Sequence, residues 1–154
     1  MNDNTETTVV ARKVLVIDDE PGIVDIVETN LVGDGFEVVS AKDGKEGLAK
    51  VQSEKPELVI LDVMMPQMDG WEVLRHMEAD PSTAGIPVIM LTAKASDEDY
   101  IHGLEEGAVE YITKPFYPQE LVNRIKITLM VLNPRMRDER RRNLITKRRR
   151  LMEE

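Results

Sequence analysis

The chain has 154 residues, enough for one domain with little left over, and its 42% hydrophobic content suits a globular core rather than wholesale disorder. It contains no cysteine and only two histidines, His76 and His102, which excludes disulfide scaffolds, thiol catalysis and metal sites of cysteine or clustered histidine. The apolar runs are too short to cross a bilayer, and the N-terminus lacks the basic and apolar regions of a signal peptide. A cytoplasmic protein is therefore expected.

The net charge of −9 is unevenly distributed along the chain. Residues 1–132 carry 11 basic and 25 acidic side chains, a balance of −14, whereas residues 133–154 carry 9 basic and 4 acidic ones, a balance of +5. An acidic body repels nucleic acid, so contact with nucleic acid is expected only through the basic segment, and weakly.

Short apolar runs alternate with segments of helical periodicity along most of the chain. Residues 1–11 are polar and aperiodic, and we expect a disordered leader there. The apolar runs predict strands at residues 14–17, 36–39, 58–61, 87–91 and 109–112. A helix is expected after each strand, with apolar positions that include Ile26, Leu48, Leu74, Leu104 and Ile125 in turn.

This alternation predicts an α/β fold, a doubly wound (βα)₅ parallel sheet. The strands at 14–17, 58–61 and 87–91 are almost wholly apolar, as central parallel strands covered on both faces should be. The strand at 36–39 alternates, which suits an edge. The expected strand order is 2-1-3-4-5, with the switch point between the first and third strands.

Polar side chains follow four of these strands at the points where they end: Asp18, Asp19, Asp62, Thr92 and Lys114. The carboxyl ends of parallel strands share one edge of the sheet, so these groups should converge on one pocket. Neighbouring carboxylates repel one another unless a cation lies among them, and oxygen donors favour Mg²⁺, with Mn²⁺ as the alternative. A lysine and a hydroxyl supply donors for phosphoryl oxygens. A carboxylate can also attack phosphorus, and Asp62, on the central strand, is the best-placed nucleophile.

Four stretches of sequence resemble the receiver domain of two-component response regulators, the CheY-like and flavodoxin-like fold, over roughly residues 12–132. They are Val14–Glu20, Leu61–Gly70, Leu91–Ala93 and Tyr111–Phe116. Residues 92–126 look most like receivers of the winged-helix transcription-factor subfamily, but the 22 residues after Leu132 are too few for a winged helix. The expected division is a leader at 1–11, a receiver domain at 12–132 and a basic helical tail or linker at 133–154.

The resemblance implies a role for each site residue. Asp62 would accept a phosphoryl group from a histidine kinase or phosphotransfer protein. Asp19, Asp62 and the backbone carbonyl of Met64 would ligate Mg²⁺, and Asp18 would hold a metal-bound water. The chain would then be a signalling module rather than an enzyme, catalysing only its own phosphorylation and dephosphorylation.

The resemblance also implies a switch. Lys114 would pair with the phosphoryl group, and the Lys114–Pro115 bond is expected to be cis. Thr92 would swing to hydrogen-bond the phosphoryl group, and Tyr111 would turn inward behind it.

Receivers of this subfamily form phosphorylation-dependent homodimers through the fourth helix, fifth strand and fifth helix, joined by ion pairs between subunits. One such pair is kept here, because Glu110 and Arg124 stand at matching positions. A second is incomplete, since Glu120 remains acidic but its basic partner is replaced by Tyr100. At a third position, where the subfamily has an acidic residue, this chain has Val109. Exposed ion pairs are weak, so these losses leave a dimer of this kind open.

The basic segment at 133–154 favours helix by composition. Arg141 and Arg148 stand where a coiled coil needs apolar side chains, which disfavours that arrangement. Four alternatives remain for this segment. It is a solvated helical extension, or a linker, in which case this chain is the N-terminal receiver of a larger regulator. Otherwise it is a helix that binds nucleic acid or an acidic partner, or a helix docked on the acidic body.

Two further functions fit less well. A phosphatase that forms an aspartyl phosphate would resemble haloacid dehalogenases, with Asp-x-Asp at the first strand and a cap, whereas the first strand here ends in Asp18-Asp19. A nucleotide-binding module would carry a glycine-rich phosphate loop after the first strand, and none follows it.

Overall fold

The computed structural model describes residues 12–131 and 134–153, so the predicted leader and the boundary at residues 132–133 lie outside the described part. The strands are β2 Lys13–Ile17, β3 Glu37–Ala41, β4 Leu58–Leu61, β5 Val88–Thr92 and β6 Glu110–Thr113. The helices are α1 Pro21–Gly33, α2 Gly44–Glu54, α3 Gly70–Ala79, α4 Asp97–Glu105, α5 Pro118–Met130 and α6 Pro134–Met152. Across these ranges, no helix is both long and apolar enough to cross a membrane.

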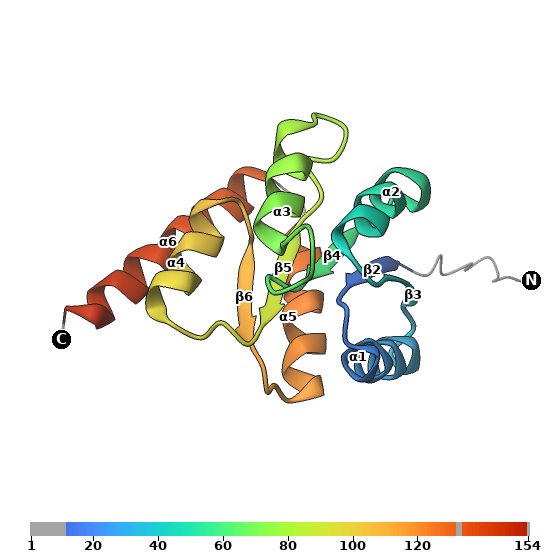
Figure 1. The fold of residues 1–154 in the computed structure, drawn as a ribbon. Coiled ribbons are helices and arrows are strands. Elements are labelled where there is room, and N and C mark those ends of the chain that lie inside the picture. Colours follow the sequence, from blue (N-terminus) through green and yellow to red (C-terminus); the bar gives the residue numbers. More distant parts are fainter. Residues whose placement is uncertain (1–11, 132–133, 154) are drawn as a thin grey trace, which may run out of the picture.

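The strands form one parallel sheet in the order β3-β2-β4-β5-β6, which confirms the predicted 2-1-3-4-5 topology. Strand β2 pairs with β3 on one side and β4 on the other, so Leu15 lies between Val39 and Val59. Helices cover both faces of the sheet (Figure 1). The carboxyl ends of β2 and β4 are therefore neighbours in the sheet.

Each face of the sheet has its own apolar core. Along β2, Leu15 and Ile17 point to the side of α2, α3 and α4, whereas Val14 and Val16 point to the side of α1 and α5. These four side chains are fully buried. Burial on both faces explains why the central strands read as continuous apolar runs.

Local sequence fixes where the helices begin. The side chains of Asp43, Asp69 and Ser96 each accept a hydrogen bond from a backbone N–H in the first turn of α2, α3 and α4. Pro21 and Pro118 stand in the first turns of α1 and α5, where a missing N–H costs nothing. Helices α1, α2, α4 and α5 therefore start a few residues after a strand ends, whereas a longer loop separates β4 from α3.

Three strands lie one residue or more later than predicted. Thr92 is the last residue of β5 rather than the residue after it, because Thr92 pairs with Thr113 and its carbonyl accepts a 2.8 Å hydrogen bond from the Lys114 N–H. These polar residues extend the ladder because backbone pairing does not depend on an apolar side chain. The shift leaves Thr92 fully buried at the end of its strand.

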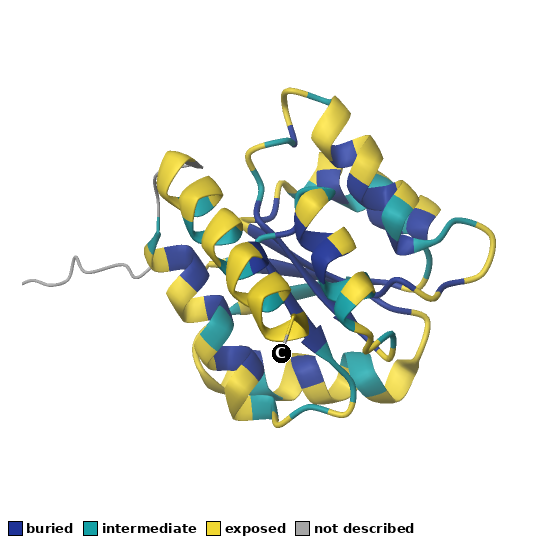
Figure 2. Ribbon diagram, turned by 90° about the vertical axis from the view of Figure 1, so that its left-hand side faces the viewer, coloured by how far each residue is buried: buried dark blue, intermediate teal, exposed yellow. Residues whose placement is uncertain are grey.

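Helix α6 docks on the body and lies beside α4 (Figure 1). Among the α6 residues whose burial is described, Ile145 alone is buried, and it joins the core cluster that contains Ile101, Leu104 and Tyr111. The outward side of α6 is largely exposed (Figure 2). Of the alternatives for the basic segment, docking on the acidic body is the one that the structure shows for residues 134–152.

Candidate functional site

Three carboxylates meet at the carboxyl ends of β2 and β4. Asp18, Glu20 and Asp62 each offer an oxygen atom within 4.8 Å of the others, and we call this group the acidic site. Asp18 and Asp62 are each 3% exposed, whereas Glu20 is exposed to solvent. Two of the three negative charges therefore lie where water solvates them poorly, and they need a positive partner.

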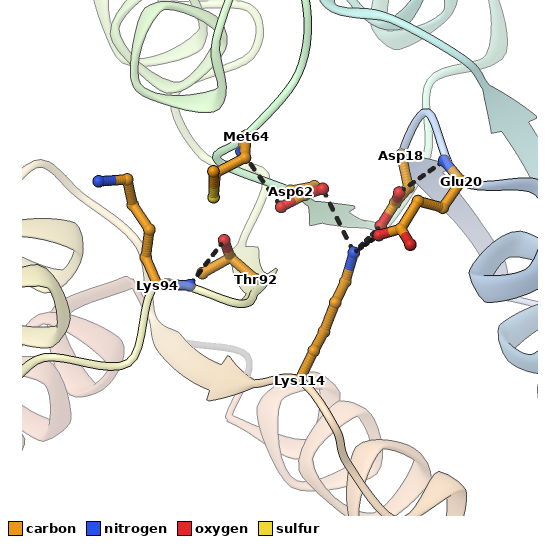
Figure 3. A network of polar contacts seen from close by, with 7 residues as sticks. All are labelled: Asp18, Glu20, Asp62, Met64, Thr92, Lys94 and Lys114. Carbon is orange, nitrogen blue, oxygen red and sulfur yellow. Dashed lines mark hydrogen bonds and ion pairs between the residues drawn. The ribbon is translucent and has the colours of Figure 1, made fainter.

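Lys114 supplies that partner from the loop after β6. Its Nζ lies 2.9 Å from Asp18 Oδ2, 2.8 Å from Glu20 Oε1 and 3.3 Å from Asp62 Oδ2 (Figure 3). The Lys114–Pro115 peptide bond is cis, as predicted. The ammonium thus contacts all three carboxylates of the acidic site.

Burial and charge have opposite effects on the pKa values of Asp18 and Lys114. Burial raises the pKa of Asp18 above its usual value, against the hydrogen bonds from Lys114 and the Glu20 N–H. Burial alone would lower the pKa of Lys114, but the three carboxylates outweigh it and hold that pKa above its ordinary value. Lys114 therefore remains a cation at neutral pH.

Three further residues flank Asp62 on the side away from Lys114 (Figure 3). The Met64 N–H donates a 3.2 Å hydrogen bond to Asp62 Oδ1, and the Lys94 N–H donates a 3.3 Å hydrogen bond to Thr92 Oγ1. Asp62 Oδ2 already contacts Lys114. Both oxygens of Asp62 thus have a donor, one on each side.

Gly70 fixes the loop that follows Asp62. A Cβ at Gly70 would lie 2.3 Å from the Asp62 carbonyl oxygen and 2.8 Å from the Val63 Cα, closer than real Cβ atoms approach backbone. Only glycine lets α3 start against the backbone of the phosphoacceptor candidate. The preceding Gln67 has a φ of 69°, in the left-handed region, so the intervening loop turns sharply.

Asp19 is not one of the three carboxylates of the acidic site. It is exposed and lines, together with Asp18, a hollow that Pro21, Asp25 and Ser40 also border. Glu20 takes its place among the carboxylates, although sequence reasoning did not select it. The available signal was its position, next to Asp18-Asp19 and one residue before the first helix. The role of Asp19 as a metal ligand stays a prediction.

Tyr111 is already turned inward. Its side chain is buried, and its hydroxyl donates a 2.7 Å hydrogen bond to the Lys94 carbonyl. Burial raises the pKa of this phenol, ahead of the nearby Asp99 and Asp62 carboxylates, so the hydroxyl stays protonated. Tyr111 thus connects β6 to the loop after β5, and its role as a switch remains a prediction.

The predicted dimer residues pair within one chain. Arg124 Nη1 lies 2.8 Å from Glu110 Oε2, and Arg140 Nη2 of α6 lies 2.9 Å from the same oxygen. Glu110 is 0% exposed, and Glu120 lies 3.8 Å from Arg124 along α5. Within this single chain, Glu110 therefore pairs with both arginines, and its pairing with Arg124 of another subunit stays a prediction.

The acidic site fits a hard divalent cation by its donor set. Its ligand atoms are carboxylate oxygens at close mutual distance, which suits Mg²⁺ better than softer metals. The ammonium of Lys114 now neutralises the same oxygens that an ion would contact. Such an ion and Lys114 would therefore have to share the carboxylates.

Comparisons with known proteins agree with this geometry. The model of the response regulator receiver domain matches residues 14–126. The chemotaxis protein CheY4 of Vibrio cholerae is 35% identical with a TM-score of 0.72, covering 76% of this chain and 98% of its own. A CheY-like receiver domain protein of Methanospirillum hungatei is 32% identical with a TM-score of 0.71, covering 87% and 99%.

A longer relative points to the same family. The alkaline phosphatase synthesis transcriptional regulatory protein PhoP of Bacillus subtilis is 45% identical over 118 residues, which is 77% of this chain and 48% of PhoP. The chain thus spans about half the length of that regulator. The family match ends within α5, so α6 lies beyond it. With its fold, its acidic site and these matches, the chain belongs to the response regulator receiver domain family of two-component systems.

Proposed function

We propose that Asp62 is the phosphoacceptor of this receiver. One observation carries the proposal: Asp62 is buried at the end of the central strand, with Lys114 at one carboxylate oxygen and the Met64 N–H at the other. An oxygen of Asp62 attacks the phosphorus of a phosphohistidine, the new O–P bond forms as the N–P bond breaks, and the imidazole leaves with the electron pair of that bond. The histidine belongs to a sensor kinase or a phosphotransfer protein.

The surrounding residues stabilise the charge that arrives. Lys114 pairs with the phosphoryl oxygens, and the hydroxyl of Thr92 and the N–H of Met64 donate hydrogen bonds to them. A bound Mg²⁺, held by Asp62, Asp18 and either Asp19 or Glu20 with the Met64 carbonyl, would neutralise phosphoryl charge in the same pocket. Mn²⁺ satisfies the same oxygen donors.

The output surface that we propose is formed by α4, β6 and α5. Tyr111, on β6, links this surface to the loop after Thr92 through its hydrogen bond to the Lys94 carbonyl. Glu110 and Arg124 lie on the surface. Once exposed, the surface would pair with a second phosphorylated copy. A basic α6 offers nucleic acid or an acidic protein only a weak contact, because several of its arginines already bind carboxylates of the body.

The test is phosphorylation by acetyl phosphate with Mg²⁺, read by intact mass. The parent should gain about 80 Da, and Asp62→Asn should gain nothing because the amide oxygen is a poor nucleophile. The matched control is Asp69→Asn, which keeps the helix cap that Asp69 provides to α3 and leaves the acidic site intact. An equal gain by Asp62→Asn would rule out Asp62 as the acceptor.

A further inference from the structure

Helix α6 covers the α4 and β6 part of the surface that the proposed function needs free. Contacts along its length hold it there, and the following are among them. Arg140 binds the buried Glu110, and Ile145 enters the core beside α4. Arg148 lies 3.1 Å from Asp97 Oδ1, and Arg149 pairs with Glu105. The acidic side chains of α4 and β6 are thus matched to the basic side chains of α6.

The contacts of α6 connect by short steps to the phosphoacceptor. The guanidinium of Arg148 lies 4.0 Å from the centre of the Tyr100 ring, and the Tyr100 ring lies 5.5 Å from the Tyr111 ring. The Tyr111 hydroxyl binds the Lys94 carbonyl, and the Lys94 N–H binds the hydroxyl of Thr92. A hydroxyl that the phosphoryl group would engage therefore lies at one end of this chain of contacts, and α6 lies at the other.

Close packing around Tyr111 makes the middle of this series of contacts sensitive to movement. A Cβ at Gly103 would lie 2.8 Å from the Tyr111 ring, so α4 sits directly on that ring. A displacement of Tyr111 or of the Lys94 loop cannot be absorbed there without moving α4. Because Tyr100 and Ile101 of α4 carry the contacts of α6, such a movement alters the surface on which α6 rests.

The buried Glu110 has a second partner besides α6. Arg124 keeps the buried Glu110 paired when Arg140 departs. Glu110 Oε1 is buried and has no hydrogen-bond partner among the described residues. Departure of α6 would expose this oxygen to water, which can donate the missing hydrogen bond. The ion pairs of Arg148 and Arg149 join side chains that are about one-third to one-half exposed, where water readily replaces the partner.

We propose that α6 is an intramolecular ligand of the α4–β6–α5 surface, and that phosphorylation of Asp62 releases it. The inference rests on the proposed function. It adds that the phosphorylated receiver offers an acidic surface with an apolar centre, made by Asp97, Ile101, Glu105 and Glu110. The partner that fits this surface is a basic helix carrying a branched apolar side chain, and α6 itself is the occupant before phosphorylation.

The experiment measures amide hydrogen exchange of residues 134–152 in the full chain, before and after acetyl phosphate with Mg²⁺. Intact mass is read on the same samples. Phosphorylation should speed the exchange of α6 by about tenfold, a coupling of ordinary size between two sites. The exchange of β4, in the core, should not change.

Two variants of α6 sharpen the result. Arg148→Gln removes the contacts with Asp97 and Tyr100, so α6 should exchange faster before phosphorylation and respond less to it. Arg142→Gln removes the same charge from an exposed position on the same helix and should behave as the parent.

The outcomes separate the two proposals. A chain that gains no phosphoryl group overturns the proposed function and this inference with it. A chain that gains about 80 Da while α6 exchanges as before overturns the inference alone. Slower exchange of α6 together with a doubled sedimentation mass also overturns it, because α6 would then dock on a second copy.

Discussion

The acidic site and the α6 contact hold charged groups in two different ways. At the acidic site, Asp62 is buried and Lys114 is half-buried, and backbone groups such as the Met64 N–H fix the carboxylate. At the α6 contact, Arg148 and Arg149 meet their carboxylates on the surface, and Ile145 is the single buried anchor among the described burial states of α6.

This difference separates a rigid region from one that can detach. Removing a partner from the acidic site strands a buried charge, which costs about 3–5 kcal/mol. An exposed ion pair of α6 contributes under about 1 kcal/mol, and burial of Ile145 about 1.5–3 kcal/mol. The acidic site therefore suits chemistry that needs fixed geometry, and the α6 contact suits a reversible switch.

Gly70→Ala should cause the largest change, because it breaks the rigid region. The added Cβ would meet the Asp62 carbonyl, and overpacking of this kind costs about 1–3 kcal/mol or more. Urea unfolding should show this loss of stability, and phosphorylation by acetyl phosphate should fall with it.

Gly33→Ala is the matched control. Apart from its chain neighbours and the backbone of α1, no atom of the described residues lies within 4 Å of a Cβ at Gly33, in the last turn of that helix. This change should therefore be neutral or stabilise the chain by up to about 1 kcal/mol. Equal stability of the two variants would show that the loop after Asp62 has room that the structure does not indicate.

The rigid region was largely predictable from sequence. Asp18, Asp62, Thr92 and Lys114 follow apolar runs, and the parallel topology brings strand ends together whatever their separation in sequence. The positions of Asp19 and Glu20 were not predictable in the same way. They lie in a loop outside the ladder, where no alternation decides which side chain turns inward.

Ile145→Ala tests the detachable region and should have the next largest effect. Loss of the buried side chain would cost about 2 kcal/mol if α6 stayed docked, which is a large part of the contact, so α6 should instead leave α4. Hydrogen exchange of α6 should become fast while that of β4 stays slow. Leu151→Ala, at a side chain that is 53% exposed, is the control and should change neither. Loss of protection throughout the chain would show that α6 belongs to the core.

The sequence left the α6 contact open for a physical reason. Its charges are compatible with water, nucleic acid, an acidic partner or the body itself, and no periodic apolar stripe selects among these. The match of Arg140, Arg148 and Arg149 to carboxylates on α4 and β6 becomes visible only once the fold places those carboxylates in a row.

Binding of Mg²⁺ should distinguish the two candidate carboxylates beside Asp18. Loss of a ligand should weaken binding by about tenfold, or 1.4 kcal/mol. We expect this for Asp19→Ala from the family resemblance, and Glu20→Gln is the comparison because Glu20 lies in the acidic site. Trp71 fluorescence, next to Gly70 at the start of α3, is the readout. Unchanged affinity in Asp19→Ala with a loss in Glu20→Gln would assign the ligand to Glu20.

The same titration should depend on pH. Burial raises the pKa of Asp18, so this carboxyl takes up a proton at a higher pH than an exposed aspartate does. Mg²⁺ binds the charged form, so its affinity should fall as the pH is lowered, and the fall should begin at a higher pH than for a site of exposed aspartates. The Asp18→Asn variant should bind weakly and lose this pH dependence, and a pH profile unchanged by that substitution would exclude Asp18 as its source.

The smallest expected effect concerns the lifetime of the phosphorylated state, which should be minutes to hours. Met64 is 56% exposed and lies beside Asp62, and Lys94 is half-buried beside Thr92 (Figure 3). A thioether cannot act as a base toward water, and a charged ammonium has donors but no acceptor, so neither side chain assists hydrolysis. The double variant Met64→Asn with Lys94→Glu introduces groups that can orient a water, and it should release phosphate about fivefold faster. Lys45→Glu makes the same charge change at an exposed position on α2 and should leave the rate unchanged. Release from the parent within seconds, or a double variant no faster than the parent, would show that hydrolysis is controlled elsewhere in the site.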